Sequence, residues 1–184
     1  TNKVHYFSGS PGMMLKQGIA NFFMDFLLGL NNEHLQALTL FQKLERHGRK
    51  TACINFPIYR GDVPHEVNMP LLLQWLLNLP KSTTVKGPTM LLLGDLLTNP
   101  DRLDIEAAFT GLANWFGFHD KNSIDLLLQI ANKNQFPDFT LAYFPENDET
   151  AHRIGPREAH QNLANLDEML GKLFDIYGGI DPFL

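Results

Sequence analysis

The stretch from Tyr143 to Pro156 reads YFPENDETAHRIGP and is rich in side chains with oxygen and nitrogen donors. Within it, Asp148 and His152 are four positions apart. On a helical turn this spacing would place both side chains on one side. A carboxylate oxygen and an imidazole nitrogen are ordinary zinc ligands, and they also suit manganese or iron. The pair therefore predicts a metal site, to which at least one more ligand must come from elsewhere in the protein.

The residues around this pair favour a metal site over a chance pairing. Alone, an Asp-x-x-x-His pattern is common, and the simpler alternative is that Asp148 caps the following turn while His152 is a solvated loop histidine. Here a β-prone run over residues 138–144 precedes a loop predicted over 146–156, which ends in a Gly-Pro step into the next helix. Ligands of open α/β sheets gather beyond the carboxyl ends of strands, where this arrangement puts the pair.

A second group of polar residues lies in the loop predicted over residues 57–69, after another short apolar run. Arg60 is placed there to hold a substrate phosphate through its guanidinium group, with Tyr59 and His65 nearby. Asn147, from the first loop, completes this candidate substrate-binding set. The alternative is a solvated loop whose polar groups satisfy its own backbone.

The elements that must position these residues alternate between helices and short strands. A stretch with few charges and no alternation predicts a buried helix over residues 11–30. Apolar patterns and helix-start signals predict further helices from Asn31 or Asn32 to 47 and over 70–79, 104–115, 122–132 and 157–177. Short β-prone runs ended by proline predict strands over 51–56 and 138–144, whereas 90–93 fits either a strand or a helical turn. No domain boundary is visible, so residues 1–184 are interpreted as one domain or a fragment of a larger one. This succession favours an α/β fold with a mainly parallel sheet flanked by helices.

Composition narrows the class of protein. The chain has 184 residues, 44% of them hydrophobic and 19% charged, which suits a globular domain with a sizeable core. Its formal net charge of −5 argues against a dedicated nucleic-acid module, because phosphate backbones attract basic surfaces. Cys53 is the only cysteine, so no intrachain disulfide can form. No apolar run is long enough to span a bilayer and no targeting signal is visible, which leaves the compartment open.

The stretch PDFTLAYFPENDETAHRIGP, from Pro137 to Pro156, resembles the type I phosphodiesterase and nucleotide pyrophosphatase branch of the alkaline phosphatase superfamily. In that branch a strand ends in an aromatic-rich loop followed by Asp-x-x-x-His-x-x-Gly-Pro. This chain is identical to the pattern at Asp148, His152, Gly155 and Pro156. The helix-Gly-strand-Pro stretch over residues 40–57 also looks like this family, so the resemblance covers the chain from about residue 38 onward.

The resemblance implies an alkaline-phosphatase-like fold and a site with two divalent metals, usually zinc, flanking a Thr or Ser nucleophile. Asp148 and His152 would map onto two of the three ligands of one metal, and the substrate would be a small phosphate ester. In such a site, paired cations neutralise charge on the non-bridging oxygens and stabilise the attacking and leaving oxygens.

Other parts of the family's pattern are not found in this sequence. The first metal-binding Asp and the nucleophile should precede the matching region, and neither is found in residues 1–37. The later Asp-His-Gly motif and the final ligand His should follow the helix that ends near Tyr177. We therefore expect a helix-rich middle segment of a larger hydrolase, with no catalytic residue of its own, that is inactive without the remainder of its parent polypeptide. The alternative is a non-catalytic α/β scaffold or interaction module, or a degenerate relative without activity.

Overall fold

The structure is a computed structural model, and it describes residues 29–32, 35–68, 74, 81–94, 118–132, 137–155, 157 and 159–179. The helix predicted over 104–115 lies outside these residues, as do nearly all of the helices predicted over 11–30 and 70–79. Pro156, the last residue of the Asp-His-Gly-Pro pattern, also lies outside them. Among the described helices, none has the length and apolar character that crossing a membrane requires.

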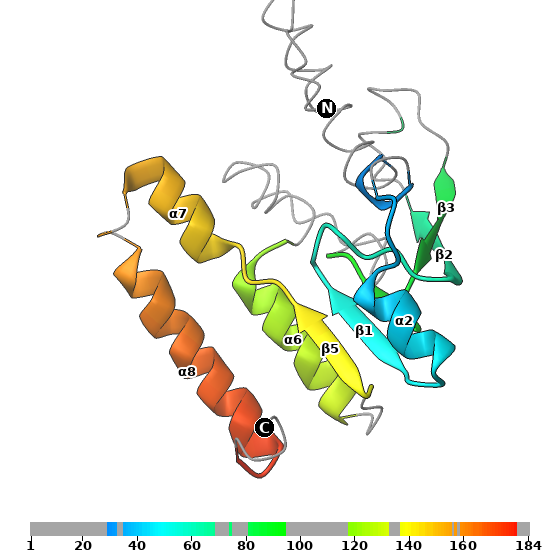
Figure 1. The fold of residues 1–184 in the computed structure, drawn as a ribbon. Coiled ribbons are helices and arrows are strands. Elements are labelled where there is room, and N and C mark those ends of the chain that lie inside the picture. Colours follow the sequence, from blue (N-terminus) through cyan, green and yellow to red (C-terminus); the bar gives the residue numbers. More distant parts are fainter. Residues whose placement is uncertain are drawn as a thin grey trace, which may run out of the picture.

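A three-stranded parallel sheet forms the centre of the described structure, as the sequence predicted (Figure 1). Its strands, in spatial order, are β4 (Met90–Leu92), β1 (Thr51–Ile54) and β5 (Phe139–Ala142). Cys53 of the middle strand lies opposite Leu91 on one side and Leu141 on the other. All four residues of β1 are buried, which explains why this strand is a short continuous apolar run without alternation.

Helices cover both faces of this sheet. Side chains along a strand alternate between faces, so Ile54 and Thr51 of β1 point to opposite sides. Ile54 packs against Leu126 and Ile130 of helix α6 (Asp120–Asn132). On the other face the Thr51 hydroxyl donates to Glu45 of helix α2 (Leu40–Arg46) at 2.8 Å. The chain therefore has the layered α/β architecture that was predicted.

The second sheet is a two-stranded antiparallel ribbon that the sequence did not predict. It pairs β2 (Val63–Asn68) with β3 (Ser82–Gly87), and the buried hydrophobic side chains Val67 and Val85 lie on its two strands. The prediction of a loop over 57–69 was therefore wrong for its second half. Pro64 suggested a loop, but a proline is tolerated where a strand has a free edge, and β2 has one described neighbour only.

The start of the helix predicted from Asn31 or Asn32 to 47 differs from its predicted position. Helix α2 begins after Thr39, whose hydroxyl accepts from the Gln42 backbone N–H while the Gln42 side chain accepts from the Thr39 N–H. Asn31, a predicted helix cap, is instead buried and bonds to the Pro57 carbonyl and the Tyr59 N–H.

Residues 146–156 were predicted to form a loop, and this prediction was wrong. Residues 146–154 form helix α7 (Glu146–Ile154), and Gly155 follows it as the C-cap with φ of 109°. The long helix α8 (His160–Ile176) follows and packs against both α6 and α7. Figure 1 shows α7 and α8 to one side of the sheet, with α6 between α8 and the strands. In the chain, strand β5 of the sheet is thus followed directly by α7, which carries the candidate metal ligands.

Candidate metal centre

Asp148 and His152 lie one helical turn apart on α7, with their side chains together. The Asp148 Oδ1 and His152 Nε2 atoms are 3.4 Å apart. Both side chains are exposed, His152 to 82% and Asp148 to 67%. Asp148 occupies the third position of α7, after an N-cap at Pro145. A proline has no N–H to which a side chain at this position could bond back, so the Asp148 carboxylate is not engaged as a helix cap.

This separation fits two ligands of a single ion. Carboxylate oxygens and imidazole nitrogens bind zinc at about 2.0–2.2 Å, and two corners of a tetrahedron with arms of that length lie about 3.3 Å apart. The observed 3.4 Å therefore needs little rearrangement to accept a tetrahedral cation. A third protein ligand is not beside the pair, because the described parts of the chain contain no group of three His, Cys, Asp or Glu side chains suited to a metal.

Helix α7 is attached to α6 through a reciprocal pair of hydrogen bonds at the first residues of the two helices. The Glu146 backbone N–H donates to Asp120 Oδ1 at 3.0 Å, and the Asp120 backbone N–H donates to Glu146 Oε1 at 3.2 Å. Asp120 is almost completely buried. Burial raises the pKa of its carboxyl above the usual range, although the Glu146 N–H partly opposes that effect. We call this pair of bonds the Asp120–Glu146 clasp.

The other side of α7 is attached to α8 through Asn162. Its side-chain amide donates to the Glu146 carbonyl at 3.0 Å and to the Thr150 hydroxyl at 2.6 Å. Glu146 and Thr150 are one turn apart, two positions before Asp148 and His152 respectively. Two residues correspond to a rotation of about 200° around a helix. Asn162 and the candidate ligands therefore lie on nearly opposite faces of α7.

A buried polar network joins the carboxyl ends of the three parallel strands. Asn55 follows β1 with φ of 56°, a left-handed conformation that asparagine tolerates better than most residues. Its Oδ1 accepts from the Gly94 N–H at 2.6 Å, and its Nδ2 donates to the Ser123 hydroxyl at 2.8 Å. Ser123 in turn donates to the Tyr143 carbonyl at 2.8 Å. This network fixes the chain after β4 and β5 relative to α6, and so fixes the point from which α7 departs.

Tyr143 is a neighbour of the pair that the sequence did not single out as functional. Its ring packs edge-on against Phe56, with centroids 6.0 Å apart. Burial raises the pKa of its hydroxyl, and the carboxylates of Asp148 and Asp120 raise it further. The Tyr143 hydroxyl is therefore neutral, and it lies near enough to Asp148 for the charge of that carboxylate to raise its pKa.

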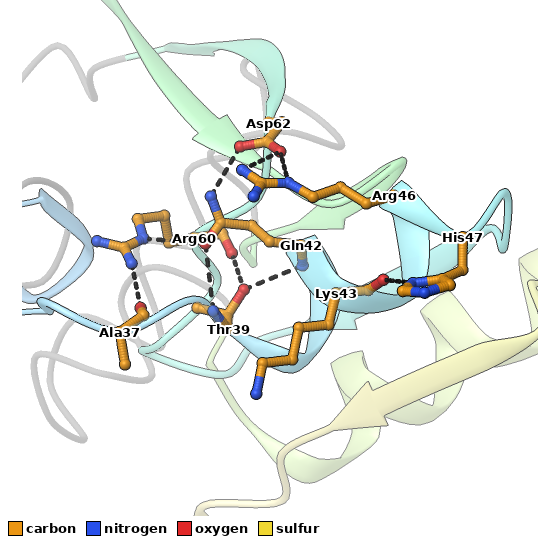
Figure 2. A network of polar contacts seen from close by, with 8 residues as sticks. All are labelled: Ala37, Thr39, Gln42, Lys43, Arg46, His47, Arg60 and Asp62. Atoms are coloured by element: carbon orange, nitrogen blue, oxygen red, sulfur yellow. Dashed lines mark hydrogen bonds and ion pairs between the residues drawn. The ribbon is translucent and has the colours of Figure 1, made fainter.

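Arg60 lies in a different setting from the one expected for a phosphate-binding residue. Its guanidinium group donates to the backbone carbonyls of Leu35 and Ala37 and, at 3.3 Å, to Gln42 Oε1. Figure 2 shows the contacts of Arg60 with Ala37 and Gln42, and Gln42 also donates to Asp62 at 2.7 Å. The described structure thus uses Arg60 to hold the segment before α2 in place.

The other predicted substrate-binding residues are not gathered around one point in the described structure. Tyr59 is fully buried, and that burial raises the pKa of its hydroxyl. His65 lies on β2 with its Nε2 atom 2.7 Å from the Pro88 carbonyl oxygen. Asn147 directly precedes Asp148 on α7, and its Oδ1 atom is buried with no hydrogen-bond partner among the residues that the structure describes.

The sequence did not indicate a functional role for Asp120 or Asn162, because each bonds to a residue far away in the chain. Asp120 precedes Glu146 by 26 positions and Asn162 follows it by 16. No local spacing links such residues. Asp120 lies two positions before the helix predicted over residues 122–132, and an aspartate near the start of a helix is common to many helices.

Comparison with known proteins gives one match. The profile of the family described as Type I phosphodiesterase / nucleotide pyrophosphatase matches residues 16–177. This range contains every described strand as well as α2, α6, α7 and α8. No match was found among curated proteins or among solved structures.

Proposed function

Because the chain belongs to the type I phosphodiesterase / nucleotide pyrophosphatase family, we propose that it forms part of a metal-dependent hydrolase of phosphate esters. In this proposal Asp148 and His152 are two ligands of one metal in a two-metal site. The observation that carries it is the 3.4 Å separation of their ligand atoms on a helix that starts just beyond the carboxyl end of β5. That edge of a parallel sheet is where α/β proteins bind their ligands.

The donor set supports a borderline divalent cation, and zinc is the metal proposed. When bound, such a cation neutralises charge on the ester's non-bridging oxygens and lowers the pKa of bound water. Asp148 would supply negative charge to the cation, and His152 would supply the lone pair of a neutral ring. Asn147 and Tyr143 are the neighbouring polar groups proposed to contact the substrate.

The remaining ligands and the nucleophile are proposed to come from the rest of the parent polypeptide. The substrate class proposed is a small phosphate ester, because a chain of formal net charge −5 does not attract a nucleic-acid backbone. In an inactive scaffold of the same fold, the Asp148–His152 contact would be only an i,i+4 ion pair that stabilises α7 and holds no metal. Metal binding by this pair therefore distinguishes the two functions.

Zinc titration of the chain by isothermal calorimetry tests the assignment. The chain without substitutions, called the parent chain below, should bind zinc weakly. Asp148→Ala and His152→Ala should each weaken zinc binding by at least about tenfold, because removal of even an outer partner of a metal ligand causes a loss of that size. The matched controls are Asp167→Ala and His160→Ala, which remove exposed residues of the same types from α8. Zinc binding that survives Asp148→Ala at full affinity would show that the ligand assignment is wrong.

A further inference from the structure

Helix α7 is held at its first turn from two directions, through residues that bind neither metal nor substrate. The clasp with Asp120 engages the Glu146 backbone N–H and the Glu146 carboxylate. Asn162 engages the Glu146 carbonyl and the Thr150 hydroxyl. One residue, Glu146, is thereby bonded through its N–H, its carbonyl and its side chain, two positions before Asp148.

We propose that Asp120 and Asn162 are positioning residues, which hold the first turn of α7 in its helical form and orient the helix so that Asp148 and His152 face outward together as ligands of one cation. This inference rests on the proposed function of the pair. Asn162 contacts the face of α7 that points toward α8, and the ligand pair lies about 200° away around the helix. Rotation of α7 about its axis would break both Asn162 bonds.

The clasp and Asn162 constrain α7 in different ways. The clasp fixes where α7 begins, because Asp120 belongs to α6 and α6 packs on Ile54 of the central strand. Asn162 fixes the rotation of α7, because its two acceptors are one turn apart on a single face. Ligand atoms must be held within about 0.5 Å of the productive geometry, and an isolated helix of nine residues cannot supply that order by itself.

Cobalt binding provides a test with an optical signal, since tetrahedral and octahedral Co²⁺ differ strongly in visible absorption. Asp120→Ala and Asn162→Ala should each weaken Co²⁺ binding by about tenfold, the loss typical of partners that orient metal ligands. Asp120→Asn keeps an Oδ1 acceptor for the Glu146 N–H and should restore the affinity of the parent chain. The matched control is Asn165→Ala, which removes an exposed asparagine whose partner is Gln161 on the same helix. Circular dichroism confirms that each variant is folded under the conditions of titration.

Hydrogen exchange without metal provides the second measurement and separates the two proposals. Amides of α7 should exchange about tenfold faster in Asp120→Ala and in Asn162→Ala, whereas amides of β1 keep the rate of the parent chain. If α7 exchanges as predicted but Co²⁺ binding does not depend on Asp148 and His152, the proposed metal site fails and the structural clasp stands. If the pair binds Co²⁺ and both alanine variants bind it as tightly as the parent, the positioning inference is overturned alone.

Discussion

Asp138 is a single residue that ties together parts of the chain far apart in sequence. Its carboxylate accepts a hydrogen bond from the Lys50 backbone N–H at 2.8 Å and one from Arg49 at 3.2 Å. Lys50 precedes the central strand, and Asp138 precedes its neighbour β5. The Lys50 N–H, and to a lesser degree Arg49, lower the pKa of the Asp138 carboxyl from its ordinary value of 3.8.

This contact predicts a pH-dependent contribution to stability. Because the pKa of Asp138 is lower in the folded chain than in the unfolded chain, its stabilising effect is complete above 3.8 and is lost as the pH falls through the lower, folded value. Asp138→Asn should therefore lower the melting temperature at neutral pH, by an amount that shrinks in acid. Thermal unfolding from pH 7 down to pH 2 measures this difference. Asp167→Asn, an exposed residue of α8, is the control, and a difference for Asp138→Asn that does not change with pH would contradict the account.

Arg60 predicts a loss of stability rather than a loss of substrate contact. Its guanidinium bonds to the Leu35 and Ala37 carbonyls join the segment before α2 to the loop after β1. Hydrogen bonds from charged donors contribute roughly 1.5–3 kcal/mol, so Arg60→Ala should reduce the free energy of unfolding by about 2 kcal/mol. Urea unfolding gives this value, with Lys43→Ala on the exposed side of α2 as the control. An unchanged midpoint would mean that these bonds contribute nothing.

At the scale of elements, the loop that connects β1 to the ribbon contacts the end of β3 through two glycines. The Gly61 N–H donates to the Lys86 carbonyl at 3.3 Å, and a Cβ atom on Gly61 would lie 1.9 Å from the Gly87 carbonyl oxygen. Backbone atoms of β3 thus occupy the space that any other side chain at position 61 would need. The ribbon can approach the loop after β1 because this position carries no side chain.

Gly61→Ala and Gly171→Ala should have opposite effects on stability. Alanine at position 61 must push β3 away, and overpacking of this kind costs about 1–3 kcal/mol. Gly171 lies within α8, and a Cβ there meets nothing within 4 Å, so alanine should stabilise the chain by up to about 1 kcal/mol. Chemical denaturation of the two variants gives both values. Equal effects of the two substitutions would contradict the close approach at Gly61.

The elements differ in how much of them local sequence determines. The strands β1 and β5 were predicted because each is a short run of β-prone residues that a proline soon follows. Helix α7 was mistaken for a loop because its residues are almost all polar, so it has no apolar stripe to reveal a helix. Its stabilising contacts come from Asp120 and Asn162. Strand β2 was not predicted either, because it forms by pairing with β3, some twenty residues further along the chain.

At the scale of the whole molecule, Asn55 connects the central strand to its neighbours and to α6. Its side chain is almost completely buried, and its bonds reach Gly94 and Ser123. A buried asparagine left without partners would be costly. The network is therefore predicted to couple the sheet and α6 energetically.

A double-mutant cycle measures that coupling. Asn55→Gly retains the left-handed backbone and removes the side-chain bonds, so it should cost about 2 kcal/mol. Ser123→Ala should cost about 1 kcal/mol, and the double variant should be about 1 kcal/mol more stable than the sum of the single effects implies. Equilibrium unfolding of the four proteins gives the interaction energy. Additivity within about 0.5 kcal/mol would show that the network does not couple the two elements.

The candidate site itself was partly predictable. The family and the Asp148–His152 pair followed from a local motif, and the family match confirms the first of these. The residues that orient the pair did not, because Asp120 and Asn162 reach Glu146 only after α6 and α8 have packed. Arg60 was predicted to bind phosphate because of its positive charge. In the fold its guanidinium group instead donates to backbone carbonyls of a segment some twenty residues earlier in the chain.

Helix α7 is only nine residues long, and this shortness gives the candidate site a thermodynamic property of its own. An ion bound by two side chains four positions apart links the ends of one helical turn, and it stabilises that turn as a cross-link would. Folding of the turn and capture of the ion are then linked equilibria, and each must favour the other by the same factor. Heat measured during titration will accordingly include the heat of ordering the helix, and any substitution that frays α7 will register as weaker affinity although no ligand atom has changed.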